Sequence, residues 1–319
     1  MDDLFSLHPS PVFLRRDALD AGYSDRHLRQ ASVAGVIRRI RHGAYVDSGV
    51  WDSASVEGRH LLLADAVVRS HDAPLALSHT SAAIAHGLRT YQQDLSKVHV
   101  LCLDESIGRT HSDVVYHHTT PRSLESMVAV TNRLVVPPTR AALEAALLTG
   151  VRNGLVVVDS VLNLGLATVD DIQREYLRIE GARGSRALRL TVRLARPGSE
   201  SVGESLGRYL MWRHHIPEPV LQFEVRDAEG HVVARLDWAW PELGLCGEFD
   251  GREKYTRYLR DGESIADVVM REKAREDLVR ELTDLRMIRL VWADLDHANQ
   301  QRTAARITQA FRRPYRLAS

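Results

Sequence analysis

Residues 222–251 read as three consecutive β-strands in the stretch QFEVRDAEGHVVARLDWAWPELGLCGEFDG. AEG suits a hairpin turn between the strands FEVRD and HVVARLDWAW, and PEL separates the second strand from the third, GLCGEFD. Asp237 then lies near the end of one strand, and Glu248 and Asp250 lie on the next. Because side chains alternate across a strand, Glu248 and Asp250 share one face, and Asp237 can point to the same place.

Carboxylates that converge in this way repel one another unless a cation neutralises them, and hard oxygen ligands favour Mg²⁺ or Mn²⁺. Such an ion would polarise a phosphodiester and lower the pKa of an attacking water. Lys254 could stabilise the charge that develops on the phosphate, and Glu204, on a helix predicted over residues 200–213, could complete the ligand set. The alternative interpretation is that these residues are surface side chains in salt bridges.

A family resemblance rests on the same residues. Asp237, ten residues and then EFDGREKY resembles the D…ExDGxxK/H core of bacterial domains related to very-short-patch-repair endonucleases, within the PD-(D/E)XK class. The resemblance covers residues 199–319 and implies a mixed sheet flanked by helices, with metal ligands at Asp237 and Glu248. The catalytic set that it implies is Asp237, Glu248, Asp250, Lys254 and Glu204. Asp250 stands where the wider class usually has lysine, so binding of metal and DNA without cleavage stays open.

The first 50 residues predict a small winged helix-turn-helix. FLRRDALDAGYS indicates a short helix ending at Gly22, Ser24 suits the N-cap of a second helix, and VIRRIRHGAYVDS suits a two-stranded wing. The second helix and the wing are basic, as a major-groove reader requires. The DNA-binding residues predicted here are Arg26, Arg29, Arg38, Arg39 and Arg41.

The segments AGYSDRHLRQ and IRRIRHGAYV resemble the N-terminal domain of AbiEi-family antitoxins of type IV toxin–antitoxin systems. LSHTSAAIAHGL resembles the segment that follows that domain in bacterial members. The resemblance implies sequence-specific DNA binding at the chain's own promoter and a cognate toxin protein as a further partner. Wings of this kind also serve protein contacts alone, which remains the alternative.

Residues 51–198 form an antitoxin-like middle region of predicted helices and short strands, such as KVHVLCLD and DVVYHHTT. The fold class expected for the whole chain is therefore α/β in the broad sense, α+β overall, with domains at 1–50, 51–198 and 199–319. Histidines are frequent in the middle region but show no metal-ligand spacing, so they are predicted to be structural or surface residues. Four tryptophans are predicted to lie in the core, namely Trp212, Trp238, Trp240 and Trp292.

Composition narrows the function classes. No stretch approaches the roughly 18 apolar residues of a membrane helix, and MDDLFSLHPSP lacks the basic start of a secretory signal. Two widely separated cysteines fit a reducing cytoplasm, so a cytoplasmic bacterial protein is expected. Lys plus Arg equal Asp plus Glu at 42 each, yet acid-free basic runs occur at 26–45, 181–199 and beyond 296. Local potential of this kind favours contact with an anion, and the alternative is that these arginines lie on solvated helix faces.

Two functions follow from these patterns. The first is a DNA-binding protein with a metal-dependent endonuclease-type domain that hydrolyses phosphodiester bonds. The second is a non-catalytic, antitoxin-like transcriptional repressor whose nuclease-type fold only binds nucleic acid or a partner. A protein–protein adaptor is a third interpretation. The recognised DNA, a preference for DNA over RNA and the oligomeric state are not specified by the sequence.

Overall fold

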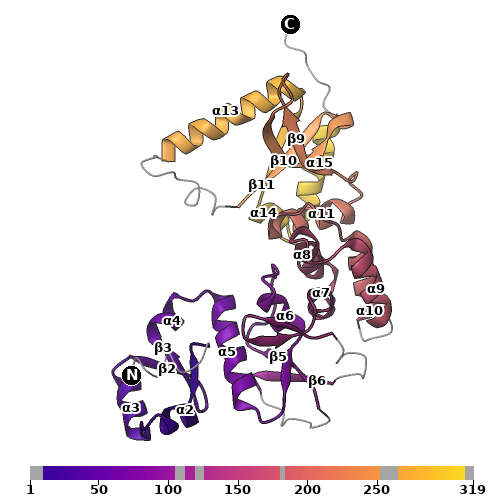
Figure 1. The fold of residues 1–319 in the computed structure, drawn as a ribbon. Coiled ribbons are helices and arrows are strands. Elements are labelled where there is room, and N and C mark those ends of the chain that lie inside the picture. The colour runs from indigo at the N-terminus through magenta and orange to yellow at the C-terminus, as the bar shows by residue number, and fades with distance from the viewer. Residues whose placement is uncertain (1–9, 105–111, 119–125, 180–183, 252–264, 313–319) are drawn as a thin grey trace. The chain divides into compact units, whose positions relative to one another are not determined.

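The computed structural model describes residues 10–104, 112–118, 126–179, 184–251 and 265–312 (Figure 1). By its internal contacts the chain divides into two compact units, Met1–Ala195 and Arg196–Ser319. Helices and three sheets are mixed along the chain, so the α+β class predicted from the sequence is confirmed. Among the described residues, no helix is both long enough and apolar enough to cross a membrane.

The first unit begins with a winged helix-turn-helix (Figure 1). Its elements are β1 (Val12–Leu14), α2 (Arg15–Asp20), α3 (Asp25–Val33), β2 (Ile37–Arg41) and β3 (Ala44–Asp47). β3 lies between β1 and β2 and is antiparallel to both. The predicted N-cap is present, because Ser24 Oγ accepts the His27 backbone N–H at 3.4 Å. Leu28 and Ile37 are buried between the helices and the sheet.

Two helices follow, α4 (Ser48–Ser53) and α5 (Val56–Ser70). Opposite faces of α5 serve two hydrophobic cores. Leu62 and Ala66 pack against β1 and β3, whereas Ala64 and Val67 join the core of the next sheet. Residues three or four apart share a face of a helix, so each pair points in one direction. Ala64 is two positions from both Leu62 and Ala66, which places it on the opposite face. Because α5 is shared, the winged helix and the middle region pack together within the first unit.

The middle region is built on a five-stranded sheet in the order β6-β5-β4-β8-β7. The strands are β4 (Leu75–Leu77), β5 (Val98–Cys102), β6 (Val114–His118), β7 (Val128–Val130) and β8 (Arg133–Val135). β5 pairs antiparallel with β4 and parallel with β6. The helices of this region are α6 (His79–Ala85), α7 (Pro138–Leu147), α8 (Gly150–Asn163), α9 (Val169–Ile179) and α10 (Ser185–Leu194).

The second unit contains a four-stranded mixed sheet in the order β12-β11-β10-β9. Its strands are β9 (Val220–Arg226), β10 (Val232–Trp240), β11 (Leu245–Asp250) and β12 (Arg286–Val291). β10 is antiparallel to both β9 and β11, and β12 is parallel to β11. The remaining elements are α11 (Val202–Arg213), the 3₁₀ turn η2 (Pro241–Leu243), α13 (Ile265–Thr283), α14 (Trp292–Leu295) and α15 (Gln300–Arg312).

Helix α11 lies unusually close to the sheet. A Cβ atom added at Gly203 would overlap the Phe249 ring, and one added at Gly207 would meet the Trp238 ring at 2.5 Å. Only glycine permits this approach, which brings the first turn of α11 next to β10 and β11. Trp238 and Trp240 are buried, as predicted. The prediction is wrong for Trp212 and Trp292, which are 40% and 39% exposed, because they occur near the end of α11 and at the start of the short α14.

Candidate DNA interface and carboxylate cluster

Four of the five predicted DNA-binding arginines lie on the outer surface of the winged helix. α3 buries Leu28 and Ala31, and it exposes Arg26 and Arg29 on the remaining face. Arg38 and Arg39 are exposed on β2. The helix and the wing strand therefore both present guanidinium groups, as a protein that tracks a phosphate backbone needs.

The surroundings of these arginines set how freely they can meet an anion. Arg26 has no ion-pair partner among the residues that the structure describes. Arg38 forms an exposed 3.2 Å ion pair with Asp52, and Arg39 Nε donates to the Arg41 carbonyl at 3.3 Å. Exposed ion pairs of this kind are worth little, so a phosphate can displace Asp52.

Arg41 is directed differently from the other four. Its Nε donates to Asp113 at 2.8 Å, and its side chain is only 17% exposed. Asp113 precedes β6, so this arginine links the wing to the middle region. Arg41 is thus held by a carboxylate of its own chain, and its predicted role in DNA binding stays a prediction.

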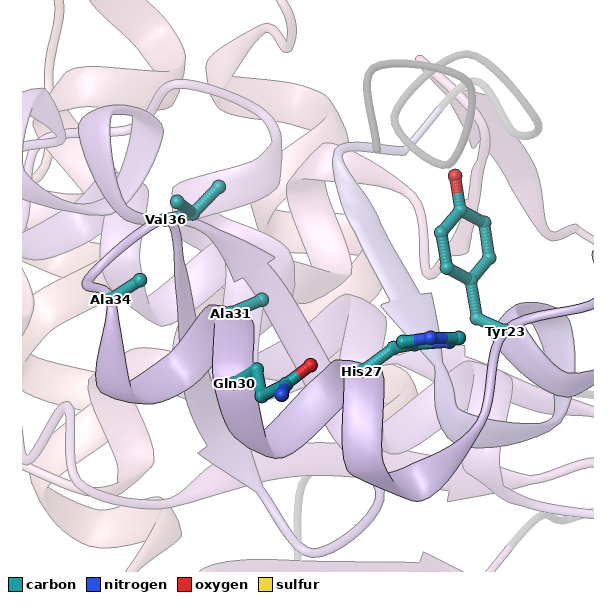
Figure 2. Close-up of a pocket in the computed structure, with 6 residues that line it drawn as sticks. All are labelled: Tyr23, His27, Gln30, Ala31, Ala34 and Val36. Carbon is teal, nitrogen blue, oxygen red and sulfur yellow. The ribbon is translucent and has the colours of Figure 1, made fainter.

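A shallow groove of about 390 Å³ follows one face of α3 (Figure 2). The residues that line it are Tyr23, His27, Gln30, Ala31, Ala34 and Val36. His27, Gln30 and Ala34 project from successive turns of the helix. An amide and an imidazole beside exposed methyl groups form a suitable set for base edges, since Gln can pair with adenine and methyls contact thymine.

In the second unit, Glu204 is the most buried of the predicted acidic residues, with 6% exposure. It lies in the first turn of α11, where Ser201 caps the helix by accepting the Glu204 backbone N–H at 3.2 Å. Its Oε2 accepts the Glu200 backbone N–H at 2.8 Å and the Gln222 amide at 2.9 Å. The close approach of α11 therefore holds a carboxylate against the sheet.

Asp237 on β10 and Glu248 on β11 occupy neighbouring antiparallel strands, as the sequence predicts. Asp237 Oδ2 accepts the Phe249 backbone N–H at 2.7 Å. Glu248, whose side chain is 9% exposed, forms a 2.6 Å ion pair with Arg275 of α13. Asp250 is half-buried at the end of β11. These three acidic residues and Glu204 thus come from three adjoining elements.

Electrostatics connect the helix to the sheet. Burial, and after it the negative charge of Asp237, raises the pKa of Glu204 to about 7. The raised pKa means that ionising this carboxyl inside the protein costs free energy. A cation bound nearby would offset that cost. Perturbed carboxyls of this kind concentrate at functional sites.

The four carboxylates do not close into a tight ligand set. In the described part of the chain, only His79, His99 and His117 form a group of three or more possible ligands whose atoms all lie within 4.8 Å of one another. Lys254 lies outside the described residues, so its predicted role stays a prediction. The metal and catalytic assignments of the acidic residues likewise remain predictions.

The histidine group was missed from the sequence. Successive members of the group are 20 and 18 positions apart, spacings that match no local ligand motif. The available signal was indirect: His99 and His117 fall on two predicted strands, and His79 follows a third short apolar run. Only the strand order and register bring the three together.

Comparison with known proteins bears on the winged helix. Two uncharacterized proteins of Mycobacterium tuberculosis, from strains CDC 1551 / Oshkosh and H37Rv, are each 30% identical to this chain over 124 residues. The aligned part covers 39% of this chain and 45% of each relative, so the chain spans less than half the length of the curated relatives it matches. Residues 1–46 match the model of a family described as "Transcriptional regulator, AbiEi antitoxin". The N-terminal region is thus similar to AbiEi antitoxins, as the sequence predicts.

Proposed function

We propose that this chain is a DNA-binding transcriptional regulator of the antitoxin type. The observation that carries the proposal is the set of exposed arginines on α3 and β2, within or beside the segment that matches the AbiEi family. Helix α3 would enter the major groove, with His27 and Gln30 toward base edges, while the wing follows the phosphates. A bacterial cytoplasm and a cognate toxin partner belong to the same proposal.

Salt dependence tests this interface. Fluorescence anisotropy would measure binding to a duplex taken from upstream of the chain's own coding sequence. Arg26→Ala, Arg29→Ala, Arg38→Ala and Arg39→Ala should each weaken binding and reduce the slope of log K against log salt by about 0.9 if the residue contacts one phosphate. Arg174→Ala is a matched control, because Arg174 is 71% exposed on α9 and pairs with Asp171. Unchanged affinity in the fourfold variant would refute DNA binding by the winged helix and favour a protein adaptor.

We further propose, as a second function, that the unit Arg196–Ser319 hydrolyses phosphodiester bonds with Mg²⁺ or Mn²⁺. This proposal is supported by Glu204, a buried carboxyl whose pKa of about 7 reflects burial and the charge of Asp237. A cluster of oxygen donors that holds excess negative charge suits a hard divalent cation. Asp237 and Glu248 would hold the ion, and Glu204 would complete the site. The ion would supply a water of lowered pKa and neutralise charge on the phosphate.

Positively charged side chains of the same unit also bear on this site. Arg275 already neutralises Glu248 at 2.6 Å, so an ion bound there has to displace or share that contact. Asp250 occupies the position where the resembled class has lysine. For that reason Lys254 and Arg275 are the candidates for stabilising charge on the phosphate. If neither performs this task, the unit binds nucleic acid without cutting it.

Plasmid cleavage separates the two outcomes. Supercoiled plasmid would be incubated with the protein and Mg²⁺ or Mn²⁺, beside EDTA and beside Asp237→Asn and Glu248→Gln. Glu242→Gln is the matched control, because Glu242 is an exposed carboxylate of the same unit. Nicking that EDTA and both site variants abolish establishes the nuclease. Intact plasmid, retarded equally by all proteins, supports the non-catalytic regulator.

A further inference from the structure

The side chains of three histidines meet beside the five-stranded sheet of the middle region. His79 opens α6 directly after β4, His99 lies on β5, and His117 lies on the edge strand β6. In the parallel pairing of β5 with β6, Leu101 is opposite His117. Since residues two apart on a strand share a face, His99 and His117 point to the same side of the sheet.

The three imidazoles are in direct contact. His99 Nδ1 lies 3.0 Å from His117 Nε2, and each of the three rings offers a nitrogen within 4.8 Å of the other two. The ring centroids of His79 and His117 are 3.7 Å apart, with the planes inclined by 14°. His99 is buried, whereas His79 and His117 are partly accessible. Solvent can therefore reach the group without crossing the core.

A hydroxyl and a carboxylate lie beside one nitrogen of His79. Nδ1 is 3.2 Å from Ser78 Oγ, its hydrogen-bond partner, and 3.3 Å from Glu144 Oε2. Glu144 Oε2 also accepts the His79 backbone N–H at 3.2 Å, and its Oε1 accepts from Arg140 at 2.6 Å. A proton on Nδ1, directed at these oxygens, leaves Nε2 of His79 as a lone-pair donor. Metal-binding histidines commonly direct their second nitrogen at a carboxylate, a backbone carbonyl or a water in this way.

A backbone feature distinguishes His79 from ordinary core histidines. It has a φ of +48°, a left-handed conformation that costs free energy for a residue with a Cβ and that concentrates at functional sites.

We propose that His79, His99 and His117 form a binding site for one divalent transition-metal cation of the Zn²⁺ class. Imidazole nitrogen is a preferred ligand of such ions, and three histidines leave a fourth position for water or an exogenous ligand. Nitrogens about 2.0–2.1 Å from a tetrahedral ion lie about 3.3 Å from one another, close to the 3.0 Å already present between His99 and His117. A neutral imidazole binds a cation through one nitrogen while its single N–H occupies the other, so the proton shared by His99 Nδ1 and His117 Nε2 has to move to the other nitrogen of its ring when the ion binds.

Binding requires the rings to reorient. The His79 and His117 rings lie face to face and cannot both direct an in-plane lone pair at one ion, so the His117 ring has to turn out of its stack on His79. The His79 and His99 rings, inclined by 23°, also have to tilt toward the ion. Its place on an edge strand and its partial exposure make His117 the ring best able to turn. Loss of this stacking on addition of metal is therefore part of the proposal.

Metal titration of the full chain tests the site. Protein freed of metal by chelation would be titrated with Zn²⁺ in competition with a chromophoric chelator, and with Co²⁺, whose visible absorption reports its coordination. We expect one ion per chain, a higher melting temperature with Zn²⁺, and protection of the three histidines from diethylpyrocarbonate in peptide mass spectrometry. Less than one ion per chain, or a Zn²⁺ affinity in the range of exposed single histidines, would overturn the proposal without any variant.

The variants are chosen so that the chain still folds. His79→Asn keeps a residue that tolerates positive φ, and His117→Ala changes a partly exposed edge position; circular dichroism without metal would check both. Each should lose the bound ion. Glu144→Gln should keep the stoichiometry and weaken affinity about 10- to 100-fold, because Glu144 only positions His79. His231→Ala, which removes an exposed histidine of the second unit, should change nothing. Equal binding by folded wild type, His79→Asn and His117→Ala would refute the site.

Discussion

Replacing Glu204 by glutamine should remove a pH dependence of stability from the second unit. Folding raises the pKa of this carboxyl from 4.5 to about 7, chiefly by burial and secondarily through Asp237. The folded state therefore holds the proton more tightly than the unfolded state does. Stability is greatest below pH 4.5, falls as pH rises toward 7, and is independent of this group at higher pH.

The size of the effect follows from the two pKa values. Each pKa unit corresponds to about 1.4 kcal/mol, so charging Glu204 costs on the order of 3 kcal/mol above pH 7. Glutamine keeps an oxygen to accept from the Glu200 N–H and from Gln222, and it carries no charge to repel Asp237. Glu204→Gln should consequently exceed the wild type in unfolding free energy at pH 8 by up to about 3 kcal/mol, and match it near pH 4.5.

Urea unfolding followed by tryptophan fluorescence suits this measurement. Four of the five tryptophans, at positions 212, 238, 240 and 292, belong to the second unit, so the signal reports mainly on that unit. Glu242→Gln is the control, because it removes an exposed carboxylate and should leave the wild-type pH profile intact. Parallel pH profiles for wild type and Glu204→Gln, or a less stable variant at pH 8, would refute the reasoning.

Three other perturbations test the packing inside each unit. Gly203→Ala should destabilise the second unit by about 1–3 kcal/mol, because the added methyl overlaps the Phe249 ring; an unchanged urea midpoint would contradict the close approach of α11. Asp65→Ala should lower the unfolding free energy of the first unit by about 3–5 kcal/mol, since Arg133, bonded to Asp65 at 2.6 and 2.9 Å and only 17% exposed, loses its buried partner. Thermal melting would measure this, and a loss below about 1 kcal/mol is incompatible with a buried pair. Burial raises the pKa of the Cys246 thiol to about 12, so iodoacetamide at pH 8 should alkylate it only after unfolding, and rapid labelling of the native chain by mass spectrometry would disprove its burial.

The winged helix shows how much local sequence can predict. The N-cap at Ser24, the apolar spacing of Leu28 and Ala31 and the alternating wing strands are short-range patterns. They indicated the helix–turn–helix–wing order, and the family match over residues 1–46 supports the same interpretation. The strands that carry Asp237 and Glu248 were predictable for the same reason, since alternation and turn residues depend only on neighbours in the chain.

The direction of individual side chains was less predictable. Arg38, Arg39 and Arg41 belong to one basic run, yet Arg41 turns inward to Asp113, which is 72 positions away. The raised pKa of Glu204 likewise depends on Asp237, which lies on a different element. Neither contact can be predicted from the residues around Arg41 or Glu204 in the sequence, because each depends on which elements become neighbours in space.

The sequence by itself predicted the two helices and the wing of the first 50 residues, the strands that carry Asp237 and Glu248, and the basic character of α3 and β2. It did not predict β4, and it assigned Phe13 and Leu14 of β1 to a helix, because strands of three residues are too short to show a period. Only the tertiary structure decided that His79, His99 and His117 form one group. The first kind of information is carried by periodicity and capping, which act over a few residues. The second requires the strand order β6-β5-β4 and its register, which are set by burying the core of the whole sheet and not by any segment alone.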